Sequence, residues 1–364
     1  MNENTFSIVQ DLPMALFAAA LALAVALASS ADNVTTVHVS GAAVTCETLK
    51  IPTLKSLGNR KAICCYPAAA ANANAPPLPL HLFAHGDLGG GVATSAYGGL
   101  LRQIAAAGFV TVAYESCDLD NFCDNGETQF LEGVKTLQYL EGHPELLPMA
   151  DFGAPYSASG HSTGARAVLM MAAVRDDPSY LANASAIAPD VLTPDVRATI
   201  AKIAAVAADH PDPMTDPKQN PDIPHWRIRR TPTFIITGQD DRLEPTLSAW
   251  VDFTKIAAPD KLYLNIANAS HLQPLAEHPE GPYIAAFAQL FALGNASAAV
   301  LLYGSGEGSL QQRAAEGFAC YSGRNAGDGR VGFVACGNGG PAVPGKFAGY
   351  CGAAAPAPGA AALA

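Results

Sequence analysis

A serine between two glycines is the first feature of this chain whose type and spacing suit covalent chemistry. The pentapeptide at 160–164, GHSTG, fits the pattern Gly-x-Ser-x-Gly around Ser162. Small residues over 154–159 suit a short strand, and the breaker-free apolar run over 165–173 predicts a helix. A strand, a tight turn and a helix form the sharp elbow that exposes a nucleophilic serine. A serine hydroxyl is a poor nucleophile alone, so partner residues must lie elsewhere in the chain.

Partners for Ser162 follow it in the order that elbow-type serine enzymes use. The serine needs a histidine to take its proton and a carboxylate to orient that histidine. In such enzymes the serine comes first along the chain, then the acid, then the histidine. Asp240 and Asp241 follow the clearest predicted strand, at 233–238, and His271 follows the next predicted strand. These three residues therefore lie at strand ends and are candidates for the acid and the base.

Nine histidines compete for the role of base, and the chain order selects one of them. His210 and His225 come before the acid, and His161 lies inside the elbow itself. The others lie in or near predicted strands, in a helix-end loop, at the start of a glycine-rich loop, or beyond the selected residue: His38, His81, His143, His85 and His278. We therefore assign the base to His271. Glu244 is a more distant alternative to the two aspartates as the acid.

A glycine-rich loop offers the hydrogen-bond donors that a serine mechanism requires. The short apolar run over 80–84 predicts a buried strand, and the sequence HGDLGGG follows it at 85–91. This loop fits neither of the glycine patterns that bind phosphate. A His-Gly start followed by glycines suits a loop whose backbone N–H groups approach a reacting oxygen without side-chain hindrance.

The elements around these residues alternate between strands and helices. Further strands are predicted over 108–114 and 185–189, and helices over 100–107 and 127–141. This alternation predicts an α/β fold with a mostly parallel central sheet and helices on both faces. Antiparallel strands at one sheet edge are predicted over 35–39, 42–45 and 61–66.

The predicted organisation has three parts. Residues 1–31 are expected to be a signal peptide, 32–318 a catalytic domain, and 319–364 a Cys-containing tail rich in Gly, Ala and Pro. Within the domain, 193–208 is predicted to be a helix. The segment 190–230 is predicted to be an insertion over the carboxyl ends of the strands. This insertion is a candidate lid, and an ordinary surface excursion is the alternative.

An apolar N-terminal run predicts export. Residues 12–28 are alanine-rich and lead into Ser29, Ser30 and Ala31, small residues of the kind that a signal peptidase reads. The run is short for a membrane span, so we expect a cleaved signal and a secreted, extracellular protein without stable membrane insertion. An uncleaved signal anchor is the alternative, because no Lys or Arg precedes the run.

The composition narrows the classes of partner. The chain has 364 residues, 49% of them hydrophobic, which is enough for one large α/β domain. Its 32 Asp and Glu outnumber its 21 Lys and Arg, giving a net charge of −11 at pH 7. This balance disfavours nucleic acid and anionic membrane surfaces, because both attract basic patches. We expect a monomer.

Eight cysteines behind a signal peptide predict disulfides. No two have the C-x-x-C spacing of zinc sites. Cys117 and Cys123 bracket an acidic loop that one bridge would close, and that loop lacks the residue order of a calcium site. Three cysteines lie in the tail, so full pairing requires at least one bridge between the tail and the main domain. No metal or organic cofactor is expected.

At these residues the chain resembles secreted α/β-hydrolases, a group that includes cutinase-like polyester (PET) hydrolases, chlorophyllases and dienelactone-hydrolase-like esterases. The resemblance covers roughly residues 40–320 without the segment 190–230. The matching motifs are FAHG at 83–86, GFVTV at 108–112, GHSTG at 160–164, GQDDRLEP at 238–245 and NASH at 268–271. The resemblance implies the α/β-hydrolase fold and the activity of a carboxylic-ester hydrolase.

The resemblance also implies roles for individual residues. In that group the acid lies four residues before a proline, which favours Asp241 over Asp240. The oxyanion donors would be the backbone N–H groups of Asp87, after the His-Gly pair, and of Thr163, after the serine.

Two departures from the group concern the substrate. Polyester hydrolases usually have an aromatic residue after the oxyanion glycine and a tryptophan after an Ala-Pro on the strand that follows the elbow helix. Here Asp87 and Asp190 take these positions, so no aromatic clamp for polymer rings is evident. The two aspartates suit a cationic or hydroxyl-rich substrate. His161 and Asp190 are the candidate substrate-binding residues.

These features predict a secreted serine carboxylic-ester hydrolase that acts through an acyl-enzyme on small-molecule or polymeric esters, including aryl esters, alkyl esters and polyesters. Ser162 attacks, His271 moves protons and Asp241 orients His271. Two alternatives stay open. One is a catalytically inactive binding protein on the same fold, and the other is a lidded lipase or an acyltransferase.

Overall fold

The computed structural model describes most of the chain between residues 35 and 332. The described ranges are 35–39, 41–52, 59–72, 74–86, 91–116, 127–177, 179, 193–212, 227–316, 319–324 and 331–332. Several predicted features lie outside them: the signal peptide at 1–31, Asp87, the Cys117–Cys123 loop, the strand at 185–189, Asp190, His225 and the tail beyond residue 332.

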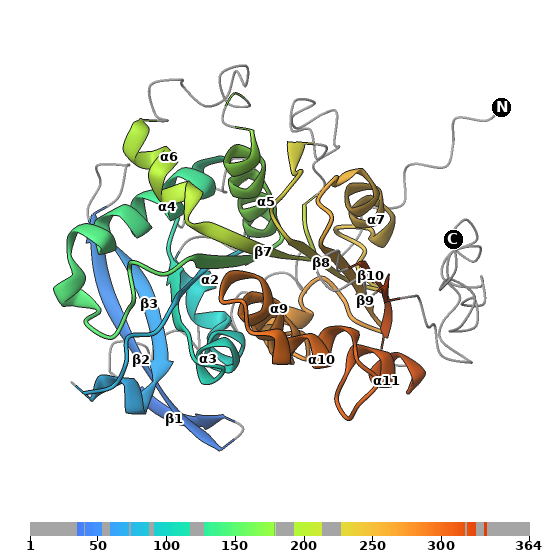
Figure 1. Ribbon diagram of the computed structural model, residues 1–364, viewed down its shortest axis with the longest axis horizontal. Helices are drawn as coiled ribbons and strands as arrows, with labels where there is room; N and C mark the ends of the chain where they lie inside the picture. The colour runs from blue at the N-terminus through green and yellow to red at the C-terminus, as the bar shows by residue number, and fades with distance from the viewer. Residues whose placement is uncertain are drawn as a thin grey trace, which may run out of the picture.

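A single sheet of 11 strands runs through the molecule in the order β1-β2-β3-β5-β4-β6-β7-β8-β9-β10-β11 (Figure 1). Its parallel strands are β4 (Leu80–Ala84), β5 (Val110–Tyr114), β6 (Tyr156–His161), β7 (Ile203–Asp209), β8 (Thr233–Gly238) and β9 (Lys261–Ile266). Antiparallel strands flank them: β1 (Thr35–Val39), β2 (Ala42–Pro52), β3 (Asn59–Pro67), β10 (Ala319–Arg324) and β11 (Val331–Gly332). The order from β2 to β9 resembles that of the α/β-hydrolase fold.

Helices cover both faces of this sheet, which confirms the predicted fold class (Figure 1). One face packs against α4 (Glu127–Gly142), α5 (Thr163–Asp176), α6 (Pro194–Ala201) and α7 (Thr246–Lys255). The other carries α2 (Gly91–Ala96), α3 (Gly98–Ala106), α8 (Gln273–Ala276), α9 (Gly281–Ala292), α10 (Ala299–Tyr303) and α11 (Leu310–Ala315). Every residue of β4, β5, β6 and β8 is buried. Such continuous burial is what a parallel strand between two helical layers requires.

The helix predicted over 193–208 is wrong in its second half. Helix α6 ends at Ala201, and β7 begins at Ile203. The alanine-rich sequence IAAVAAD of β7 favours a helix locally, but the chain is held in the sheet between β6 and β8. The segment 190–230 is therefore not one insertion, because it contains a central strand. Its residues 213–226 lie outside the described part of the chain.

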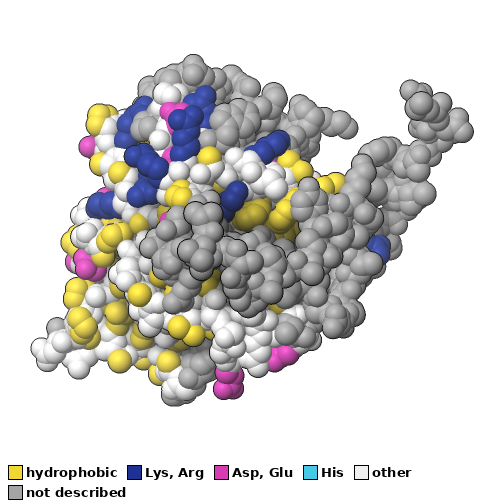
Figure 2. Space-filling model, turned by 45° about the vertical axis from the view of Figure 1, so that its right-hand side comes forward, with side chains coloured by type: hydrophobic (Ala, Val, Ile, Leu, Met, Phe, Trp, Pro, Cys, Tyr) yellow, Lys and Arg dark blue, Asp and Glu magenta, His cyan; other side chains and the backbone are white. Residues whose placement is uncertain are grey.

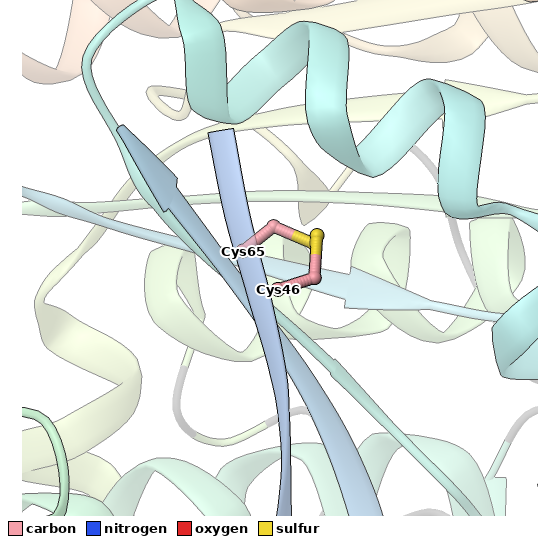
Figure 3. Close-up of a disulfide and its surroundings, with 2 residues drawn as sticks. All are labelled: Cys46 and Cys65. Carbon is pink, nitrogen blue, oxygen red and sulfur yellow. A yellow bond between two sulfur atoms is a disulfide. The ribbon is translucent and has the colours of Figure 1, made fainter. Parts of the chain in front are cut away.

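Two further findings concern the predicted tail and the cysteines. The first residues of the tail form β10, which pairs antiparallel with β9 and so extends the main sheet. Cys46 and Cys65 face each other across β2 and β3 and form a disulfide, with Cα atoms 4.1 Å apart (Figure 3). Cys64 is buried with a free thiol, whose pKa burial raises. Among the described residues, no helix has the length and apolar character needed to span a membrane.

Candidate active site

The Gly-x-Ser-x-Gly sequence forms a sharp turn from β6 into α5. Ser162 has φ 55° and ψ −124°, a region that non-glycine residues rarely adopt and that costs about 1–3 kcal/mol. Backbone bonds hold the turn: the N–H of Ser162 donates to the carbonyl of Asp209 at 3.0 Å. A Cβ on Gly160 would overlap the backbone of Gly164, and one on Gly164 would overlap the carbonyl of Ala84. The two glycines thus let strand and helix approach closely enough to form the elbow.

Ser162, His271 and Asp241 form a continuous hydrogen-bonded series. The Nε2 atom of His271 lies 3.0 Å from the Oγ of Ser162, and its Nδ1 lies 2.9 Å from Oδ2 of Asp241. Each residue is buried with 6–8% of its surface exposed. The structure therefore brings together Ser162 and His271, which the chain order selects, and Asp241, which the resemblance favours, from the ends of β6, β9 and β8.

Local backbone contacts decide which of the two aspartates faces His271. Oδ1 of Asp241 accepts the N–H groups of Leu243 at 3.0 Å and Glu244 at 2.8 Å, so the carboxylate is fixed in its own loop. Asp240 is exposed, and its backbone N–H donates to the carbonyl of Ala269 at 2.8 Å. Its side chain therefore points to the surface, and Asp241 supplies the carboxylate.

The glycine-rich loop begins directly beside the elbow. Asp87 lies outside the described residues, but Gly86 precedes it, and a Cβ on Gly86 would lie 3.2 Å from the Cβ of Ser162. Thr163 is the first residue of α5, where a backbone N–H has no acceptor within the helix. That end of a helix also favours negative charge. Thr163 is thus placed to donate to an anion beside Ser162.

His85 fixes the start of the same loop from inside the protein. Its buried ring donates from Nδ1 to the carbonyl of Gly86 at 2.7 Å. Its Nε2 accepts the backbone N–H of Ser116 at 3.2 Å, and the side chain of Gln129 donates to the carbonyl of His85 at 2.8 Å. These bonds tie the end of β4 to the end of β5 and to α4, so His85 has a structural role.

The side chain of His161, a predicted substrate-binding residue, lies buried and is bonded within the protein. Its ring is 1% exposed. Nε2 donates to the backbone carbonyl of His271 at 2.8 Å, and Nδ1 accepts the hydroxyl of Tyr97 at 2.6 Å. With both ring nitrogens bonded inside the protein, the side chain of His161 offers no free polar atom to a substrate, so these bonds favour a structural role over the predicted substrate contact.

Asp190 lies outside the described residues, so its contact with a substrate stays a prediction. The strand beside β6 is β7, so the residues at its carboxyl end are Asp209 and His210. Both are fully buried, and Nδ1 of His210 donates to Oδ1 of Asp209 at 2.7 Å. The His210 ring centroid lies 6.0 Å from that of His271. Because 193–208 was predicted to be a helix, Asp209 and His210 were not recognised as residues at a strand end. The sequence DHPD at 209–212 was the signal that could have indicated it.

A second buried acid lies near this pair. Glu280 is fully buried and accepts the side-chain N–H of Gln273 at 2.8 Å. Burial, and then the charge of Asp209, raise the pKa of Glu280 to about 8. Gln273 and Glu280 are therefore a second buried polar pair, which sequence reasoning did not find. Among the described residues, no group of three or more His, Cys, Asp or Glu is arranged to hold a metal ion.

A scan against protein-family models and a search of the curated proteins find no match for this chain. The assignment to an α/β-hydrolase-like fold therefore rests on the strand order and on the helices that cover both faces of the sheet.

Proposed function

We propose that the protein is a serine carboxylic-ester hydrolase that acts through an acyl-enzyme. The observation that carries this proposal is the hydrogen-bonded series Ser162–His271–Asp241, with the serine on a strained elbow. A histidine within 3.0 Å of the hydroxyl is in reach to take its proton, and a buried carboxylate on the far nitrogen holds the reactive tautomer.

In the first half-reaction, Oγ of Ser162 attacks the carbonyl carbon of the ester while its proton moves to Nε2 of His271. The carbonyl oxygen gains negative charge, and the backbone N–H groups of Thr163 and Asp87 would stabilise it. Asp241 stabilises the imidazolium. The bond to the alcohol then breaks, and His271 gives its proton to the leaving oxygen, which leaves the acyl group on Ser162.

In the second half-reaction, water attacks the acyl-enzyme. His271 takes a proton from the water, and the carbonyl oxygen again accepts the negative charge. The bond to Oγ breaks, His271 returns the proton to Ser162, and the carboxylic acid leaves. The overall reaction consumes one ester and one water and releases the alcohol and the carboxylic acid.

The compartment and the substrate belong to the same proposal. The Cys46–Cys65 disulfide favours an oxidising compartment, in agreement with the predicted signal peptide and secretion. The substrate would be a small-molecule or polymeric ester, and the enzyme would work as a monomer without a cofactor.

The replacement Ser162→Ala tests this function. With a p-nitrophenyl acyl ester as substrate, we expect kcat to fall at least about a thousandfold, because no nucleophile remains. Ser309→Ala is the matched control: Ser309 is buried but caps α11 by accepting the N–H of Gln312 at 3.3 Å. The control loses about 1 kcal/mol of stability and keeps its activity.

Retention of more than a tenth of the wild-type kcat by Ser162→Ala would exclude the proposed nucleophile. A panel of acyl chain lengths and a polyester film, measured on the wild-type protein, separates a general esterase from a lipase or a polyester hydrolase. A wild-type protein without turnover on any of them would favour the alternative of a binding protein on this fold.

A further inference from the structure

The hydroxyl of Tyr97 lies where the glycine-rich loop meets the elbow. Tyr97 directly precedes α3 and is fully buried, with its ring 4.8 Å from that of Phe83 between centroids. Its hydroxyl oxygen accepts the backbone N–H of Gly86 at 3.0 Å. The same hydroxyl lies 2.6 Å from Nδ1 of His161. Tyr97 therefore contacts the residue before the predicted oxyanion donor and the residue before the serine.

His161 continues this series of bonds to the loop of the base. Its Nε2 lies 2.8 Å from the carbonyl oxygen of His271. Because a carbonyl can only accept, Nε2 carries the proton and Nδ1 is the acceptor for the Tyr97 hydroxyl. The bonds thus run from the N–H of Gly86 to Tyr97, from Tyr97 to His161, and from His161 to the backbone of His271.

Both side chains keep the protonation that these bonds require. Burial, followed by the neighbouring His271 and His210 rings, holds the pKa of His161 well below its ordinary value, so the ring stays neutral. Burial also raises the pKa of Tyr97 above its ordinary value, so the hydroxyl keeps its proton. The ring centroids of His161 and His271 are 4.7 Å apart, which places the two side chains in direct contact.

We propose that Tyr97 and His161 are positioning residues that fix the backbone of Gly86, at the start of the glycine-rich loop, relative to the backbone of His271 across the Ser162 elbow. The inference rests on the proposed function of Ser162 and His271. The two loops are separated by 185 positions between Gly86 and His271 and come from different strands (271 − 86 = 185). Among the described residues, Tyr97 and His161 provide a side-chain link between their backbones.

The reaction requires this link because its groups must be aligned at the same moment. The oxyanion donor after Gly86 must point at the carbonyl oxygen while Nε2 of His271 points at Oγ of Ser162. A misplacement of the reacting groups by about 1 Å, caused by a mutation at a distant residue, can cost about a hundredfold in rate. A purely structural pair would lower stability and leave the rate constants unchanged, so kinetics distinguish the two roles.

The replacement Tyr97→Phe is the first test, because it removes the hydroxyl and keeps the buried ring. We expect kcat for a p-nitrophenyl ester to fall about 10- to 100-fold, with KM within about threefold of the wild-type value. Tyr156→Phe is the matched control at the other end of β6, where the hydroxyl donates to Glu141 at 2.7 Å. It also loses a buried hydroxyl, and its kcat should stay within about twofold of wild type.

Rescue by a conservative replacement is the second test. In His161→Gln, the amide oxygen can accept from Tyr97 and the amide N–H can donate to the carbonyl of His271. In His161→Leu, neither bond can form. We expect the Gln variant to keep a kcat at least tenfold higher than the Leu variant, with similar KM values.

The results distinguish a failure of the positioning role from a failure of the proposed function. If Ser162→Ala is inactive while Tyr97→Phe keeps the wild-type kcat, the positioning role is wrong and the ester hydrolase stands. Equal kcat values for His161→Gln and His161→Leu also overturn the role, and they decide it even if Tyr97→Phe fails to fold. A Ser162→Ala variant that retains wild-type activity would instead refute the proposed function.

Discussion

Two aspartates, one at each end of the parallel strands, hold a loop by accepting backbone N–H groups with one carboxylate oxygen. They differ in the partners of the second oxygen. Asp241 follows β8 at the carboxyl ends of the parallel strands, and Asp176 ends α5 at their amino ends. Oδ1 of Asp241 accepts two backbone N–H groups, and Oδ2 faces His271. Oδ2 of Asp176 accepts three backbone N–H groups, from residues 229–231, at 2.6–2.9 Å.

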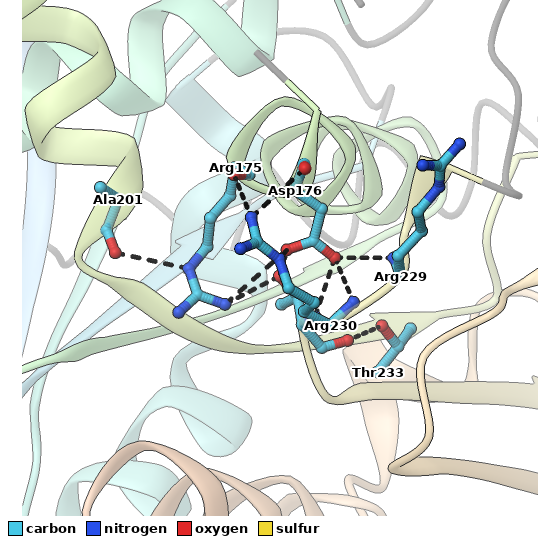
Figure 4. A network of polar contacts seen from close by, with 7 residues as sticks. Arg175, Asp176, Ala201, Arg229, Arg230 and Thr233 are labelled. Atoms are coloured by element: carbon cyan, nitrogen blue, oxygen red, sulfur yellow. Dashed lines mark hydrogen bonds and ion pairs between the residues drawn. The ribbon is translucent and has the colours of Figure 1, made fainter.

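The remaining contacts of Asp176 are also structural. Its Oδ1 accepts the hydroxyl of Thr231 at 2.8 Å and lies 4.0 Å from Arg175 and 3.8 Å from Arg230 (Figure 4). Arginines thus surround this end of α5, and Figure 2 shows Lys and Arg side chains gathered on one part of the surface despite the net charge of −11. Helix α5 therefore begins at the Ser162 elbow and ends at Asp176, whose two oxygens both hold structural partners. At the elbow side of the sheet, Oδ2 of Asp241 instead faces His271.

The largest expected effect comes from Asp241→Asn. The amide oxygen can still accept the backbone N–H groups of the Asp241 loop, so the free energy of unfolding should change by less than about 1 kcal/mol. The amide cannot stabilise an imidazolium at His271, so kcat should fall about a thousandfold or more. Ester hydrolysis and urea denaturation, measured on the same preparation, separate the two effects.

Asp176→Asn is the matched control at the structural end. We expect its kcat to stay within about twofold of wild type and its free energy of unfolding to fall by about 2–4 kcal/mol. The amide has one oxygen and no charge, so it cannot serve both the three N–H groups and the donors of Thr231, Arg175 and Arg230. If Asp176→Asn loses activity while keeping its stability, or Asp241→Asn loses stability while keeping its activity, the assignment of the two ends is wrong.

A smaller effect is expected from the middle of the sheet, where His81 links β4 to β6. Its ring nitrogens lie 2.8 Å from Oγ of Ser157 and 2.7 Å from Oγ of Ser159, and burial lowers the pKa of His81 to about 3. The unfolded chain binds a proton at this histidine below about pH 6.5, whereas the folded chain does so only near pH 3. The contribution of neutral His81 to the free energy of unfolding is therefore fully present above about pH 6.5 and is lost as the pH falls below that value.

This histidine alone predicts a loss of about 2 kcal/mol in the free energy of unfolding between pH 7 and pH 5. Urea denaturation at several pH values measures it. His81→Gln, which does not titrate, should be less stable at pH 7 but should show a shallower pH dependence over this interval. If the free energy of unfolding of His81→Gln changes with pH as steeply as that of the wild-type protein, His81 does not cause the pH dependence.

The sequence was enough to predict the residues whose signals are local. Ser162 stands out by its glycines and its flanking strand and helix, and His271 and the pair Asp240 and Asp241 follow apolar runs that are short enough for strands. The choice of Asp241 within that pair came from the resemblance. Their order along the chain then reduces nine histidines to one candidate. The structure places all three within hydrogen-bond distance in series.

Features that depend on tertiary contacts were not predictable in the same way. The alanine-rich β7 is a strand because it lies between β6 and β8, and a helix has the same local composition. The bond from Tyr97 to His161 joins residues 64 positions apart, and the Cys46–Cys65 pairing depends on the register of β2 against β3. No spacing rule identifies such pairs, because the sheet order brings them together.

Covalent labelling tests whether His271 activates Ser162. A fluorophosphonate probe reacts with an activated serine and adds a fixed mass to the peptide that contains it. We expect a single adduct on Ser162 in the wild-type protein, with labelling slowed at least about a hundredfold in His271→Ala. An adduct on another serine, or equal labelling rates in the two proteins, would contradict it.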